Sequence, residues 1–176
     1  QQQFPLHSYQ RLARLMHELR VVKSPAEIEM MRHACRLTER GFRRVLRFVK
    51  PGVNEMEVEA EFAHEFIRGG GGFAYNPIIG SGMNACVLHY LDNDQVCQKG
   101  DLLLIDVGAS YGNYHSDMTR TIPVSGRFTP RQKDVYNAVL RVMRGVSALS
   151  APGKLPIEWQ KDAERMMQEE LLGLKL

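Results

Sequence analysis

The sequence lacks the features that mark membrane-spanning and nucleic-acid-binding proteins. None of its apolar runs approaches the roughly 18 residues that a transmembrane helix needs. The formal net charge of +3 is small, and the basic residues are scattered over the 176 positions, so no basic patch for nucleic acid is indicated. We therefore expect neither a membrane nor a nucleic acid among the partners of this protein.

Cysteine is scarce, and its spacing argues against a disulfide framework. The three cysteines are an odd number and include no CxxC pair: Cys35, Cys86 and Cys97. This pattern favours reduced thiols and a cytoplasmic location. Cys86 borders a predicted buried run, so we interpret it as a small core hydrophobe rather than as a nucleophile.

The most informative stretch in an otherwise ordinary globular composition (44% hydrophobic, 24% charged) is a predicted β-hairpin. Leu102–Val107 is a short apolar run, typical of a strand that is buried on both faces. Tyr111-Gly112-Asn113 supplies turn residues, and Met118–Val124 is predicted to be the returning strand.

Two registers of this hairpin place two aspartates on one face of the sheet. A loop centred on Tyr111-Gly112 sets Asp106 directly opposite Asp117. A turn at Gly112-Asn113 pairs Asp117 with Gly108 instead and leaves Asp106 diagonally across from Asp117. The spacing alone leaves both registers open.

Facing carboxylates, one of them inside an apolar run, destabilise a sheet unless something neutralises their charge. A shared proton would do so, and so would a divalent cation, which prefers hard oxygen ligands. The alternative is that Asp106 and Asp117 do not interact, with one exposed at the strand end and the other capping a turn. The hairpin alone does not decide between a metal site and this arrangement.

Helices are predicted on both sides of the strands. The first covers Tyr9 to Arg20, and capping boxes at Ser24, Asn54 and Thr129 open three more. The second helix carries one apolar stripe, Ile28, Met31, Cys35, Phe42, Val45 and Val49. The third buries Val58, Phe62 and Phe66 and stops at a glycine run that lacks the Lys-Ser/Thr of a phosphate loop. The fourth turns inward Val135, Val139, Val142, Val146 and Leu149, and a last helix covers Ile157 to Leu172.

Between these helices lie short strands that are joined by turns rather than by helices. Besides the hairpin, we expect strands within Asn76–Gly82 and at Val87–Tyr90. This order predicts an α+β fold in which helices cover one face of a curved antiparallel sheet, and it disfavours a parallel doubly wound sheet.

In this order and at this spacing, the motifs resemble the aminopeptidase P and prolidase branch of the pita-bread metallopeptidases. The segments that carry the resemblance are Met16–Ile28, Tyr75–Gly82, Val87–Tyr90, Gly100–Gly108, Ser116–Thr121 and Gly126–Gln132. The resemblance implies that residues 23–176 are the first half of a pita-bread domain. Residues 1–22 would be the end of an N-terminal domain with its linker helix.

The resemblance also implies a site that binds two divalent ions, for which we expect manganese. Asp106 would chelate one ion and Asp117 would bridge both. The family completes its site with a histidine and two glutamates from downstream motifs that this sequence does not contain. We therefore expect a fragment of a longer enzyme that is inactive by itself and prone to associate, with a homo-oligomer as its assembly.

Four further residues receive roles from the same resemblance. His89 would be the catalytic histidine that contacts the substrate or the reaction intermediate, and Tyr75 would line the same cleft. Thr119 and Arg120 would hydrogen-bond and screen Asp117.

The implied activity is that of an Xaa-Pro aminopeptidase, which releases the N-terminal residue from peptides with proline in second position. An Xaa-Pro dipeptidase shares every motif present here and is the first alternative. The second is a non-catalytic binding module that kept the fold and lost the site. Creatinase-like chemistry is disfavoured by the paired aspartates, and methionine aminopeptidase by Leu88-His89-Tyr90 and Gly126–Thr129.

Overall fold

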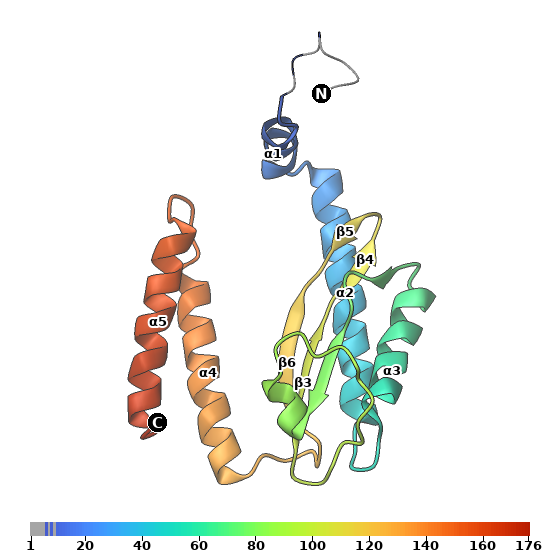
Figure 1. Cartoon of the computed structure of the whole chain (residues 1–176), viewed down its shortest axis with the longest axis vertical. Helices are drawn as coiled ribbons and strands as arrows, with labels where there is room; N and C mark the ends of the chain where they lie inside the picture. The colour runs from blue at the N-terminus through green and yellow to red at the C-terminus, as the bar shows by residue number, and fades with distance from the viewer. Residues whose placement is uncertain (1–5, 7, 9) are drawn as a thin grey trace.

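The computed structural model describes residues 6, 8 and 10–176 and has the predicted α+β order. The described residues form five α-helices, one 3₁₀ helix and six short strands (Figure 1). The helices are α1 (Ala13–Val21), α2 (Pro25–Phe48), α3 (Glu55–Arg68), the 3₁₀ helix η1 (Gly82–Cys86), α4 (Pro130–Leu149) and α5 (Pro156–Gly173). The strands are β1 (Gly72–Phe73), β2 (Ile78–Ser81), β3 (Leu102–Val107), β4 (Ala109–Tyr111), β5 (Tyr114–His115) and β6 (Met118–Pro123).

The strands form two small antiparallel sheets that share one long hairpin. The first sheet has the order β1-β4-β5 and the second has the order β2-β3-β6. The outgoing arm of the hairpin passes from β3 to β4 at Gly108, and the returning arm passes from β5 to β6 at Ser116 and Asp117. The site residues of the hairpin therefore lie at the junction of the two sheets.

The hairpin adopts the second of the two predicted registers. Asp106 pairs with Thr119, and the turn consists of Gly112 and Asn113, whose φ values are 56° and 65°. A two-residue turn of this kind needs positive φ at both central positions, as in type I′ turns. Glycine and asparagine tolerate that conformation, whereas Tyr111 would be strained in it, so the register centred on Tyr111-Gly112 is wrong.

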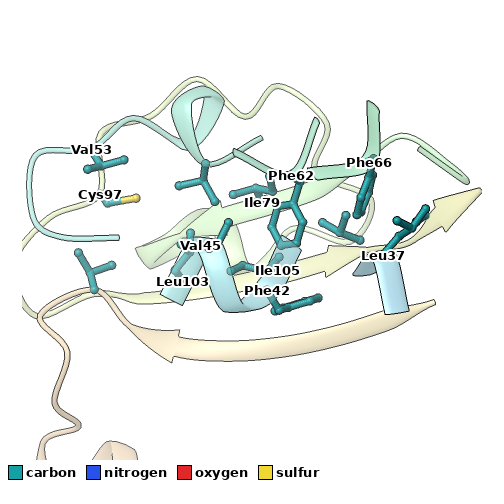
Figure 2. Packing of buried hydrophobic residues seen from close by; sticks show 14 residues of the cluster. Leu37, Phe42, Val45, Val53, Phe62, Phe66, Ile79, Cys97, Leu103 and Ile105 are labelled. Atoms are coloured by element: carbon teal, nitrogen blue, oxygen red, sulfur yellow. The ribbon is translucent and has the colours of Figure 1, made fainter. Parts of the chain in front are cut away.

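The core lies between the strands and the two helices α2 and α3. Leu103, Ile105 and Val107 of β3 are fully buried, and the cluster around them includes the aromatic side chains of Phe42 and Phe62 (Figure 2). The alternate residues of β3, which include Asp106, are only half-buried. The expectation that β3 is buried on both faces is therefore wrong for the face that carries Asp106.

The predicted stripe on α2 is correct only in its second half. Phe42 and Val45 are buried, whereas Ile28, Met31 and Cys35 are exposed. The first turns of α2 contact the tip of the hairpin, where the Tyr114 hydroxyl donates to Glu27 at 2.8 Å and the His33 ring lies against Tyr111. Ile28, Met31 and Cys35 lie on another side of the helix, which the strands do not cover. The face of α2 that covers the sheet consists of Ala34, Leu37, Thr38, Gly41, Phe42 and Val45.

All three predicted capping boxes are present, at Ser24, Asn54 and Thr129. Each box satisfies two backbone N–H groups at a helix start, which fixes where α2, α3 and α4 begin. In contrast, α1 begins at Ala13, while the predicted start at Tyr9 lies outside the described residues. Every residue of α1 is exposed, and the domain division at residue 22 stays a prediction.

Helices α4 and α5 pack on each other as a hairpin that stands beside the sheet (Figure 1). Ala138 and Val142 are the buried residues of α4, whereas Val139, which was predicted to point inward, is 48% exposed. Val139 lines a mostly apolar groove of about 350 Å³ between α4 and β6. The other residues of this groove include Leu102, Thr119, Thr121, Val135, Tyr136 and Met143. None of the described helices is long and apolar enough to cross a membrane.

The groove predicts self-association of the 176-residue chain. Within the described residues, β6 pairs only with β3, so its outer edge and the adjoining apolar groove are open to a second molecule. Sedimentation velocity should show a weight-average sedimentation coefficient that rises with concentration. Val139→Lys should weaken the association at least about 10-fold, because it places a charge in the groove.

Leu172→Lys is the matched control, since Leu172 is an exposed apolar residue on α5 that does not line this groove. It should associate like the unmodified chain. A monodisperse monomer at all concentrations would contradict the prediction.

Candidate metal centre

Asp106 and Asp117 converge on a single hydroxyl group. The Oη of Tyr75 lies 2.7 Å from Oδ1 of Asp106 and 3.0 Å from Oδ1 of Asp117. A phenol has one proton to donate, so it cannot satisfy both carboxylates fully. The hairpin thus brings two like charges together, and the predicted proximity of these carboxylates is present in the structure.

Close contact between the two arms of the hairpin makes this convergence possible. Gly108 lies across from Asp117, and a Cβ at Gly108 would collide with the carbonyl oxygen of Ser116 and approach the ring of Tyr75. Only glycine permits the backbones and the Tyr75 ring to come this close. Gly108 therefore allows Tyr75 to reach both carboxylates.

A buried pair of hydroxyls anchors this junction to helix α2. The amide N–H of Ala109 is 2.9 Å from both Thr38 Oγ1 and Ser116 Oγ, and the two hydroxyl oxygens are 2.6 Å apart. The amide of Ser116 also donates to the carbonyl of Ala109 across the hairpin, at 2.9 Å. Because Ser116 precedes Asp117 directly, this network fixes the backbone that presents the Asp117 carboxylate.

The hydroxyl of Tyr75 remains a donor throughout the physiological pH range. Partial burial of the ring raises the pKa of Tyr75 above its ordinary value of 10.0, and the hydrogen bond and negative charge of Asp106 raise it further. Asp117 acts in the same direction with a smaller effect.

The two carboxylates suit divalent cations but offer an incomplete ligand set. Carboxylate oxygens are hard donors of the kind that manganese and magnesium prefer, and a cation between them would remove their mutual repulsion. Among the described residues, no group of three or more His, Cys, Asp or Glu side chains could hold a metal ion. The residues present therefore fit one side of a metal centre.

Thr119 and Arg120 lie on opposite faces of the sheet. Thr119 pairs with Asp106 and shares its face, whereas Arg120 pairs with Ile105, whose side chain belongs to the core. The guanidinium of Arg120 donates to the carbonyl of Thr119 at 2.7 Å. The structure thus places Thr119 beside the carboxylates. It does not bring Arg120 to Asp117, in contrast to the expectation from the sequence that Arg120 would screen this carboxylate.

His89 does not lie in a strand, so the strand predicted at Val87–Tyr90 is wrong. Residues 82–86 form η1, and a turn at 88–89 follows, in which His89 has a φ of 56°. That left-handed conformation is incompatible with a β-strand. His89 is exposed, whereas the adjacent Tyr90 is buried and its hydroxyl donates to Glu55 at 2.8 Å. The catalytic role of His89 stays a prediction.

The sequence reasoning missed Thr38, Ser116 and Glu55. Thr38 gave a weak signal, because it is a polar residue between the apolar Leu37 and Phe42 on the face of α2 that covers the sheet. Glu55 follows the capping residue of α3 and resembles any first-turn acid, and only the structure reveals that it is fully buried.

The profile of metallopeptidase family M24 matches residues 29–175. The Xaa-Pro aminopeptidase of Escherichia coli is 40% identical over 161 residues, which are 91% of this chain and 36% of that protein. The human Xaa-Pro dipeptidase is 39% identical over 160 residues, which are 88% of this chain and 32% of that protein. The chain thus spans about a third of the length of these relatives.

Two solved structures share the fold over nearly the whole chain. A variant of Escherichia coli aminopeptidase P in complex with substrate superposes with a TM-score of 0.89 at 39% identity, over 92% of this chain and 37% of that one. A putative aminopeptidase P from Bacillus anthracis superposes with a TM-score of 0.94 at 35% identity, over 99% of this chain and 42% of that one. These superpositions support the predicted fold, the first half of a pita-bread domain.

The hydroxyl anchor at Ala109 predicts a measurable effect of a nearly isosteric substitution. Thr38→Val removes one of the two acceptors of the Ala109 N–H and one partner of Ser116 Oγ, so the free energy of unfolding should fall by about 0.5–1.5 kcal/mol. Thr38→Ser keeps the hydroxyl and should recover most of that loss. Urea unfolding monitored by circular dichroism measures both variants, and equal stability of Thr38→Val and the unmodified chain would contradict the role of the anchor.

The raised pKa of Tyr75 predicts a pH-dependent effect of Tyr75→Phe. Because the folded-state pKa exceeds the unfolded value, the stability that this hydroxyl contributes is complete below pH 10 and is lost as the pH rises above it. The difference in unfolding free energy between the unmodified chain and Tyr75→Phe should therefore narrow from about pH 9 to 11. Chemical denaturation at a series of pH values tests this, and a constant difference would refute it.

Proposed function

Because the chain belongs to metallopeptidase family M24, we propose that it is part of an Xaa-Pro aminopeptidase, which removes the N-terminal residue from peptides with proline in second position. The observation that carries this proposal is the convergence of Asp106 and Asp117 on the Tyr75 hydroxyl. A binding module has no need to hold two like charges at one point. A hydrolytic metal centre does need this, since its cations compensate the repulsion.

In this proposal Asp106 and Asp117 hold two divalent ions, and manganese is the metal that the family resemblance implies; carboxylate oxygens are hard donors that suit it. When bound, such a pair of ions supplies a nucleophilic water at neutral pH. Tyr75 orients the two Oδ1 atoms, and Thr119 flanks Asp106 on the same face of the sheet. His89 would donate a hydrogen bond to the peptide carbonyl or move a proton there.

The first alternative, an Xaa-Pro dipeptidase, shares all of these residues and has support in the human relative at nearly equal identity. Substrate length separates the two activities, because a dipeptidase cleaves Ala-Pro whereas an aminopeptidase also removes alanine from Ala-Pro-Ala. We further propose that the protein acts in the cytoplasm, which its reduced cysteines favour, and that it is a homo-oligomer.

The proposal is tested with the full-length product of the gene that encodes this chain, loaded with Mn²⁺ and supplied with Ala-Pro-Ala. Asp106→Asn and Asp117→Asn should each lower kcat/KM at least about 100-fold, because each removes a metal ligand. Asp134→Asn is the control, since Asp134 is an exposed aspartate on α4, and it should leave the rate unchanged. Release of free alanine measures the rate.

Two outcomes would contradict the proposal. Cleavage of Ala-Pro without cleavage of Ala-Pro-Ala would establish the dipeptidase instead. Unchanged rates in both aspartate variants would contradict the assignment of Asp106 and Asp117 as metal ligands. The 176-residue chain alone should show no turnover with Mn²⁺, because its described residues hold only part of a metal site.

A further inference from the structure

The segment that carries His89 has little packing of its own. It runs from Gly82 to Asn93, and most of its apolar side chains face solvent. The exposed fraction is 81% for Met83, 53% for Val87 and 87% for Leu88. Because burial of these residues does not hold the segment in place, its conformation depends on polar contacts at its ends and on one within it, the hydrogen bond from Asn84 Nδ2 to the Tyr90 hydroxyl at 3.0 Å.

One buried carboxylate, that of Glu55, contacts both ends of this segment. At the first end, its Oε1 accepts hydrogen bonds from the backbone N–H of Ser81 at 2.6 Å and from the Ser81 hydroxyl at 2.7 Å. At the second end, its Oε2 accepts from the Tyr90 hydroxyl at 2.8 Å and from the Gln95 N–H at 3.1 Å. Glu55 is fully buried, so these four donors replace the water that would otherwise hydrogen-bond to its carboxylate.

The position of Glu55 on its helix adds a further favourable interaction. It is the first residue of α3, where the N-terminal end of the helix dipole stabilises a negative charge. A carboxylate with four donors at a helix start is a rigid connection, because every alternative arrangement leaves a buried charge without partners.

Asn93 holds the returning end of the segment against β2. Its Oδ1 accepts from the N–H of Ile79 at 3.0 Å and its Nδ2 donates to the carbonyl of Pro77 at 3.0 Å, so the side chain substitutes for a paired strand. Between these two residues lies Ile78, which pairs with Asp106. The end of the His89 segment is thereby brought to the edge of the strand that neighbours the carboxylate.

We propose that Glu55 is a positioning residue that fixes the segment Gly82–Asn93 and thus presents His89 to the substrate. The function of His89 in this inference rests on the proposed peptidase activity. The role of Glu55 in fixing the segment does not rest on that activity, because it follows from the four hydrogen bonds alone.

Glu55→Gln is the sharpest test, since it preserves size and removes one acceptor. In either orientation of the amide, its NH₂ group must face one of two backbone donors, the N–H of Ser81 or the N–H of Gln95. One end of the segment therefore loses its backbone hydrogen bond to the side chain of residue 55, whichever way the amide turns. Glu57→Gln is the matched control, because Glu57 lies in the same first turn of α3 and its Oε2 caps only the N–H of Asn54.

Hydrogen exchange measured by mass spectrometry on the 176-residue chain under native conditions reads out the segment directly. In Glu55→Gln, peptides covering residues 82–95 should exchange at least about 10-fold faster, whereas peptides from α2 and β3 keep their rates. Glu57→Gln should leave both regions unchanged. Uniformly faster exchange throughout the chain, or unchanged exchange in residues 82–95, would overturn the proposal.

Tyr90→Phe is the second variant to measure, and it tests the same proposal if Glu55→Gln does not fold. It removes one donor at the second end only, so it should speed exchange in the same peptides by a smaller factor, and unchanged exchange there would overturn the proposal. In the full-length enzyme, Glu55→Gln should lower kcat more than it changes KM, because His89 would be misplaced while the metal ligands remain.

Failure of this inference can be distinguished from failure of the proposed function. A full-length protein without peptidase activity, combined with faster exchange in Glu55→Gln, refutes the peptidase and leaves the role of Glu55 in holding the segment intact. An active enzyme in which Glu55→Gln alters neither exchange nor kcat refutes the positioning role alone.

Discussion

The repulsion between the carboxylates of Asp106 and Asp117 is the constraint on which the rest of the site depends. Two like charges that share one phenol proton separate unless the backbone holds them together. Gly108 allows the arms of the hairpin to meet closely, and the hydroxyls of Thr38 and Ser116 tie that junction to α2. The close junction of the hairpin is thus what keeps the two carboxylates together at this position.

Helices α2 and α3 serve the site in different ways, although both cover the same face of the sheet. Helix α2 supplies Thr38, which fixes the backbone next to the carboxylates. Helix α3 supplies Glu55, which fixes the segment that carries His89. Each contribution is a polar group buried at the margin of an apolar core, where low polarity strengthens its hydrogen bonds and makes their loss costly. The two proposed metal ligands and the predicted catalytic histidine are therefore positioned by separate networks, both anchored in one core.

Local sequence signals predicted most of the fold, because capping boxes and turn residues act over three or four positions. The starts of α2, α3 and α4 and the pairing of the hairpin arms follow from such signals. The wrong predictions concern residues whose burial or conformation depends on contacts with distant parts of the chain. Exposure of Ile28 depends on which side of α2 faces the hairpin, the turn at His89 depends on the buried Glu55, and the placement of Arg120 depends on the register. The convergence of the aspartates was predictable from alternation, whereas Thr38 and Glu55, whose partners lie far along the chain, were not.

The side chains of strand β3 alternate between a buried face and an open face, and each face has a different role. Leu103, Ile105 and Val107 need a closed face, since their burial stabilises the fold. Asp106 lies on the open face, where the proposed cation and peptide substrate would have to reach it. A slip of one residue would bury Asp106 in the core and expose its apolar neighbours, so the apolar core itself enforces the register that the site requires. The stability of the fold and the placement of Asp106, the first proposed metal ligand, are consequently set by the same interaction.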